Sequence, residues 1–127
     1  MATKDPEDKR LPVYNTTRQL YKQLRRSTQK VPVNVSRGPV AETEALLIGM
    51  LDTLSFAEFS TKVSRMEYIQ EAQKILNRVK IRVRTLHDLG YIHKKGYKAL
   101  GRYESSVSVQ LDLWAKKTLT RQEETLL

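Results

Sequence analysis

The fold is decided by residues 66–89, which read MEYIQEAQKILNRVKIRVRTLHDL. Apolar residues recur here with alternating spacings of three and four, at Ile69, Ala72, Leu76, Val79, Val83 and Leu86. This spacing places them on one face of an α-helix and is typical of helices that pack lengthwise against each other. Gly90 follows, and glycine commonly ends a helix in the left-handed conformation. We therefore predict a helix over residues 66–89 with one buried face.

Two more helices are predicted before this one. Residues 12–29 begin with Pro12, which suits a first helical turn, and end before Val31-Pro32, because the residue preceding a proline avoids the helical conformation. Residues 36–39 (SRGP) are predicted to continue the break as a turn-rich connector. Residues 40–60 then carry a broad apolar face with acidic residues in their first turns, and predict a second helix.

A last helix is predicted over residues 93–118. Val107, Val109, Leu111 and Leu113 alternate as in a strand, but no other segment offers a strand partner. The predicted fold is all-α, an antiparallel up-down four-helix bundle over residues 11–118. Residues 1–10 are interpreted as a flexible arm and residues 119–127 as a frayed or disordered tail.

The amino-acid composition excludes several classes of protein. The 127 residues suit one domain, and the absence of cysteine excludes disulfides and thiolate metal sites. No segment approaches the roughly 18 consecutive apolar residues of a membrane span, and residues 1–10 lack a signal-peptide core. We expect a cytoplasmic protein without a membrane partner.

The distribution of charge along the chain indicates binding of a polyanion. The chain has 23 Lys and Arg against 14 Asp and Glu, a formal net charge of +9. Bases stand at i, i+4, i+8 in Lys74, Arg78 and Arg82, and a similar row on residues 12–29 comprises Arg18, Lys22, Arg25 and Arg26. Such segregated charge is typical of nucleic-acid binding, the alternative being a generally basic, solvated surface.

No catalytic, cofactor or metal site is predicted. His87 and His93 lie on either side of the Gly90 break, no Glu-x-x-His motif or glycine-rich phosphate loop occurs, and His87 beside Asp88 is interpreted as a solvated helix end. The aromatic residues at apolar-stripe positions are assigned to the core, and Tyr91 is the best candidate for stacking on a base.

Four segments carry a resemblance to a known family. They are Leu11-Pro12-Val13-Tyr14, the break at Val31-Pro32, ILNRVKIRVRTLHDLGYI at 75–92 and QLDLWAKK at 110–117. In their order and pattern, residues 11–118 resemble the accessory variability determinant (Avd) proteins of diversity-generating retroelements. A weaker resemblance is to the four-helix-bundle proteins encoded in intervening sequences of ribosomal RNA genes.

The Avd resemblance implies a pentameric four-helix bundle that binds a reverse transcriptase and its RNA, with DNA as a further candidate, and supports mutagenic cDNA synthesis. The polymerase chemistry would belong to the partner. It implies a basic surface at Arg18, Lys22, Arg25, Arg26, Lys74, Arg78, Lys80, Arg82 and Arg84. Two other functions stay open: a stand-alone RNA-binding or structural bundle of the intervening-sequence type, and a pure protein-interaction module.

Overall fold

The computed structural model describes residues 11–126, with side chains described for residues 11–120. Its elements are α1 (Pro12–Ser27), α2 (Val33–Val35), the π-helix η2 (Ser36–Val40), α3 (Ala41–Phe59), α4 (Lys62–Asp88) and α5 (Lys94–Leu126). Since α2, η2 and α3 follow one another without a break, the described residues form four long helical segments and contain no strand. The prediction of an all-α fold is confirmed.

The connector predicted at residues 36–39 is wrong, because these residues are helical. Pro32 precedes the helix with φ −58° and ψ 153°, and helical backbone begins at Val33. Pro39 lacks the N–H that an α-helix would use, and the backbone widens into a π-turn in which Ala41 N–H reaches the carbonyl of Ser36. The second helical segment therefore starts seven residues before the predicted Val40.

The predicted apolar face of α4 is confirmed, because all six of its residues are buried. Ile75, which stands off that spacing, is also buried, so the apolar face of α4 is wider than predicted. The helix starts at Lys62, four residues before the predicted start. Gly90 has φ +85°, Tyr91 N–H donates to the Leu86 carbonyl (2.9 Å) and Gly90 N–H to the His87 carbonyl (2.9 Å), as in a Schellman motif.

The stretch with strand-like alternation lies within α5. Val107 and Leu111 are buried, whereas Val109 and Leu113 are more than half exposed, as helical geometry requires. The helix continues to Leu126, eight residues beyond its predicted end at Thr118, and the interpretation of residues 119–127 as a frayed or disordered tail stays a prediction. Residue 127 and the arm predicted at 1–10 lie outside the described residues.

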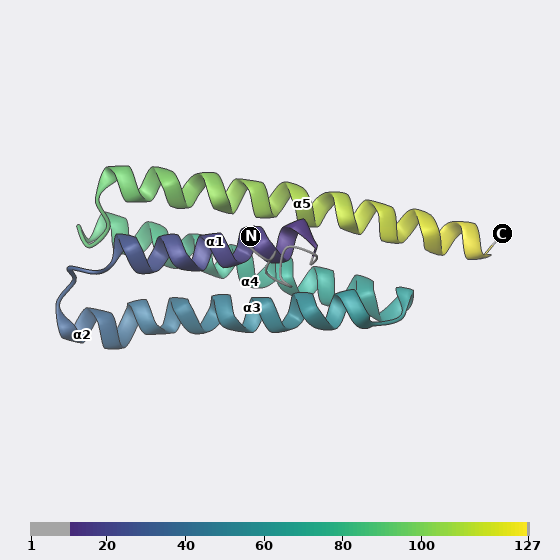
Figure 1. Ribbon diagram of the computed structural model, residues 1–127, viewed down its shortest axis with the longest axis horizontal. Helices are drawn as coiled ribbons and strands as arrows, with labels where there is room; N and C mark the ends of the chain where they lie inside the picture. The colour runs from purple at the N-terminus through teal and green to yellow at the C-terminus, as the bar shows by residue number, and fades with distance from the viewer. Residues whose placement is uncertain (1–10, 127) are drawn as a thin grey trace, which may run out of the picture.

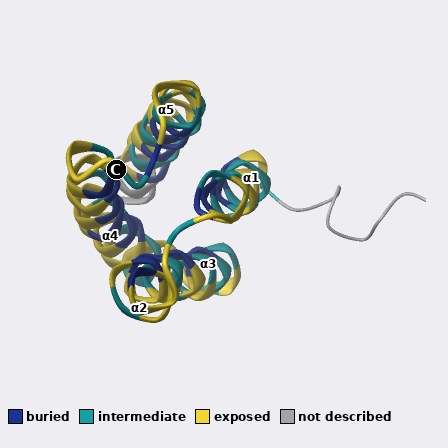
Figure 2. Ribbon diagram, turned by 90° about the vertical axis from the view of Figure 1, so that its left-hand side faces the viewer, coloured by how far each residue is buried: buried dark blue, intermediate teal, exposed yellow. Residues whose placement is uncertain are grey.

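The helices lie lengthwise beside one another (Figure 1). Viewed along the long axis, α1 and α4 stand at opposite corners, and each packs against both α3 and α5 (Figure 2). The side chains between them form one apolar core that includes Leu20, Leu47, Met50 and Leu100, all with no exposed surface. This diagonal placement of α1 and α4 decides where their basic residues face.

Arg65 links the end of α3 to the start of α4. Its guanidinium donates to the carbonyl oxygens of Ala57 (2.9 Å), Glu58 (3.2 Å) and Ser60 (3.3 Å), which lie at the end of α3. The last carbonyls of a helix have no intrahelical partner, and a cation is favourable at that end of the dipole. Arg65 therefore serves to stabilise the fold and not to bind a ligand.

Candidate nucleic-acid interface

The basic residues predicted on α4 do not point in one direction. Each step of four residues turns about 40° around a helix, so Lys74 and Arg82 differ by about 80°. Lys74 and Arg78 are exposed and form no ion pair with another residue of 11–120. They are the two members of this row that are most open to a polyanion.

The other three bases predicted on α4, Lys80, Arg82 and Arg84, lie near acids. Arg82 Nη1 donates to Glu42 Oε2 of α3 at 2.8 Å, with side chains 44% and 63% exposed. An ion pair this exposed is worth less than about 1 kcal/mol, so a phosphate can compete for Arg82. Arg84 lies 4.0 Å from Asp88 one turn later. Lys80, half-buried, lies close enough to Glu104 of α5 for its charge to lower the pKa of that carboxyl.

The basic row of α1 is mostly exposed. Lys22, Arg25 and Arg26 are exposed, while Arg18 is half-buried. Arg25 Nη1 donates to the Tyr21 hydroxyl at 3.4 Å, with its guanidinium 6.0 Å from the ring centroid. Because α1 stands diagonally across the bundle from α4, its outward face and that of α4 lie on opposite sides (Figure 2). The nine predicted residues therefore form two separate surfaces in a single chain.

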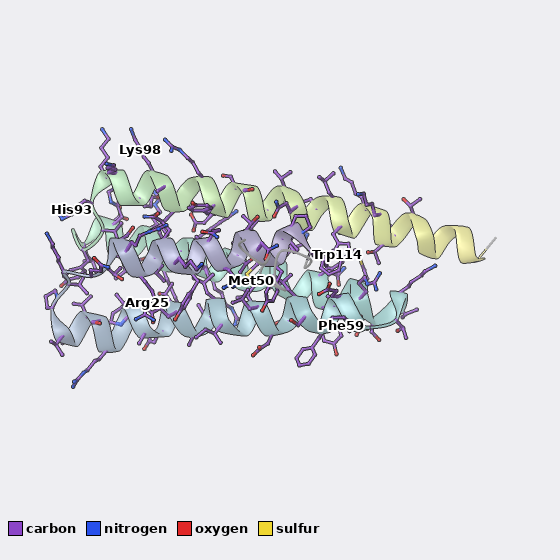
Figure 3. The ribbon with its side chains drawn as sticks, in the orientation of Figure 1. Arg25, Met50, Phe59, His93, Lys98 and Trp114 are labelled. Carbon is purple, nitrogen blue, oxygen red and sulfur yellow. The ribbon has the colours of Figure 1, made fainter. Side chains whose placement is uncertain are left out.

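A third basic surface lies at the start of α5. Its members are exposed and fall within the first three turns of that helix, at Lys94, Lys95, Lys98 and Arg102. Lys98 projects away from the bundle at the same end as His93 (Figure 3). Within residues 11–120, none of the four forms an ion pair. The predicted site omitted these residues, although 94, 98 and 102 repeat the i, i+4, i+8 spacing that identified the row on α4.

His87 is a structural residue, which corrects its interpretation as a solvated helix end. Its Nδ1 donates to the Ile92 carbonyl at 2.7 Å. Its ring stacks on that of Tyr97, with centroids 4.0 Å apart and planes within 2° of parallel. These contacts hold the loop between α4 and α5 in place. In the part of the chain that the structure describes, no cluster of three His, Cys, Asp or Glu residues could hold a metal ion.

Most aromatic side chains belong to the core, as predicted. Tyr14, Tyr21, Tyr97 and Trp114 are partly buried against it. Tyr91 is also half-buried, and one side of it lines a groove between the end of α1 and the start of α5. The stacking predicted for Tyr91 therefore has a cavity in which a ligand could reach the ring.

Glu104 is the one acidic side chain buried among residues 11–120. It is 7% exposed, and its Oε2 has no hydrogen-bond partner there. Burial raises the pKa of Glu104 from 4.5 to about 7, while the nearby positive charge of Lys80 opposes part of the rise. The carboxyl lies inside the bundle and is placed to affect stability rather than ligand binding.

Comparison with known proteins adds no assignment. No protein-family model matches the chain, and no curated protein matches it in sequence. Among the residues that the structure describes, no helix has the length and apolar character needed to cross a membrane. Function is therefore inferred from the residues and surfaces themselves.

Proposed function

We propose that this chain is a non-enzymatic, cytoplasmic accessory subunit of a reverse transcriptase of the diversity-generating retroelement type, which binds RNA and DNA through basic helix faces. The proposal rests on the exposed cations that have no acidic partner in residues 11–120. These include Lys74 and Arg78 on α4 and Lys98 and Arg102 on α5. The polymerase partner rests on the resemblance of residues 11–118 to Avd proteins.

The spacing of the bases favours contacts to phosphates. Residues four apart on a helix lie about 6 Å apart along its axis, close to the separation of successive phosphates on an extended strand. Contacts to phosphates depend on charge and not on the nucleotide sequence, because they do not involve the edges of the bases. We therefore expect binding that depends strongly on salt and only weakly on nucleotide sequence.

We further propose an antiparallel up-down four-helix bundle that assembles into a homo-oligomer, a pentamer by the resemblance. Short connections between helices packed lengthwise support the bundle topology. The outward side of α3 supports self-association, because Ile48 (48%), Phe56 (60%) and Phe59 (77%) are largely exposed there. A helix whose apolar residues extend round to its outward side is typically covered there as well.

The proposal is tested by the salt dependence of RNA binding. Fluorescence anisotropy with a labelled 20-nucleotide RNA would be measured from about 50 to 300 mM salt for the wild type and for Lys74→Gln/Arg78→Gln. Each lost phosphate contact lowers the slope of log K against log salt by about 0.7 to 0.9. The double variant is therefore expected to lose about 1.5 from the slope, with unchanged helical circular dichroism.

A matched control separates local contacts from net charge. Lys116→Gln/Lys117→Gln removes the same charge from exposed positions near the other end of α5. This control is expected to change the slope by less than half as much. Equal effects would contradict a contact at Lys74 and Arg78, and salt-independent binding would contradict the whole electrostatic account. A pull-down from the native host that recovers RNA without a polymerase would favour the stand-alone RNA-binding bundle.

A further inference from the structure

A groove of about 680 Å³ lies at the end of the bundle where α1 ends and α5 begins. Its volume falls within the roughly 300–1,000 Å³ of small-molecule sites in proteins. Cationic side chains come from both of its walls: Arg26 and Lys30 from the end of α1 and the loop after it, and Lys95 from the start of α5. The described lining contains no acidic residue. The groove therefore favours an anion.

Hydrogen bonds within α1 position one wall of the groove. Gln23 accepts a hydrogen bond from Arg26 Nη2 at 3.1 Å and donates its own Nε2 to Ser27 Oγ at 2.9 Å. A Cβ built at Gly96 would lie only 2.7 Å from Ser27 Oγ, so α1 and α5 approach closely there. A guanidinium that is already oriented loses less entropy on binding a phosphate than a free side chain does.

An aromatic ring completes the groove. Tyr91 lines it, and its backbone is fixed by the hydrogen bond to Leu86 and by the left-handed Gly90 before it. Tyr91 is only partly buried against the core, and an aromatic residue that lines a groove can offer a surface on which any base can stack. Phosphate-binding cations beside a stacking ring match the two chemical parts of a nucleotide.

We propose that this groove binds one unpaired nucleotide of a single strand, with its phosphate at Arg26, Lys30 and Lys95 and its base against Tyr91. The inference rests on the proposed nucleic-acid binding and deepens it, because the helix faces bind any phosphate backbone whereas the groove admits only a base that is not paired. It predicts a preference for single strands over duplexes.

The test compares a labelled 12-nucleotide oligouridine with a blunt 12-base-pair RNA duplex, for variants of the full chain. Tyr91→Leu is expected to weaken single-strand binding about tenfold and to leave duplex binding unchanged, since stacking on one base contributes about a factor of ten. Tyr91→Phe keeps the ring and is expected to bind like the wild type. Equal single-strand affinity of Tyr91→Leu and the wild type would overturn the proposal.

A second pair of variants tests the phosphate. Lys30→Gln/Lys95→Gln removes two charges from the groove, and Lys116→Gln/Lys117→Gln removes two from exposed positions further along α5, outside the groove. The groove pair is expected to weaken single-strand binding at least fivefold more than the control pair. Equal losses would overturn the groove and leave the proposed function standing, whereas a wild type that binds neither probe at 50 mM salt would overturn both. Adenosine monophosphate that binds more tightly than the oligonucleotide would assign the groove to a free nucleotide instead.

Discussion

Glu104 gives the most quantitative prediction, because its environment links stability to pH. Its pKa is raised from 4.5 to about 7 by burial, so the folded protein holds a proton there that the unfolded chain releases near pH 4.5. The contribution of Glu104 to stability is therefore fully present below pH 4.5 and is lost as the pH rises through about 7. The sign is opposite to that of a carboxylate in a salt bridge, which stabilises at high pH.

The magnitude follows from these two values. Linkage between pKa values of 4.5 and about 7 lowers the free energy of unfolding by at most about 2.5 kcal/mol between pH 5 and pH 8. Relaxation of the bundle and entry of water around the ionised carboxylate reduce this to about 1–2 kcal/mol. Glu104→Gln removes the titration while keeping the shape of the side chain.

The assay is urea unfolding of wild type and Glu104→Gln at pH 5 and pH 8. The stability of the variant relative to wild type is expected to rise by about 1–2 kcal/mol from pH 5 to pH 8, and this difference cancels any constant effect of the buried amide. Glu71→Gln, an exposed acid on α4, serves as control and is expected to show no such rise. Parallel pH profiles for wild type and Glu104→Gln would refute the assignment of a buried, protonated carboxyl.

Three further predictions concern packing, backbone and assembly. Val83→Asp, which places a charge in a position 1% exposed, is expected to lower the free energy of unfolding by more than about 3 kcal/mol, seen in thermal melts by circular dichroism. Gly90→Ala is expected to cost about 1–2 kcal/mol because of φ +85°, whereas Gly101→Ala, in open space within α5, is expected to gain about 0.5–1 kcal/mol in the same melts. Ile48→Lys is expected to convert the proposed oligomer to a particle of about 15 kDa by light scattering, and an unchanged mass would contradict the role proposed for the outward face of α3.

The helices were predictable where one periodic signal dominated. In α4 the spacing of Ile69 to Leu86 identified both the helix and its buried side, since burial of apolar area is the main contribution to helix stability in proteins. The limits of α2 and η2 were not predictable in the same way. Gly38 and Pro39 ordinarily mark a turn, and only the packing of Val35 and Val40 into the core explains why helical backbone passes through them.

The candidate site was less predictable than the fold. The spacing of residues in the sequence shows which side of a helix they share, but it does not show which residues of other helices lie next to them. The bases of α4 appear equivalent in the sequence, yet Arg82 meets Glu42, Lys80 lies near Glu104, and Lys74 and Arg78 meet neither. The groove depends on bringing together residues about 60 positions apart, such as Lys30 and Lys95. No local pattern in the sequence contains that information.

The distribution of charge explains why α3 is the surface best suited to meet another copy of this chain. It carries no base, and its outward side exposes Ile48, Phe56 and Phe59. The outward faces of α1, α4 and α5 carry exposed cations, so two copies that met through those faces would repel each other at short range. Contact through α3 would cover apolar area without adding a cation from that side. Because a ring pairs the α3 face of one copy with a different face of the next, such assembly would cover part of one basic face and leave the others open to nucleic acid.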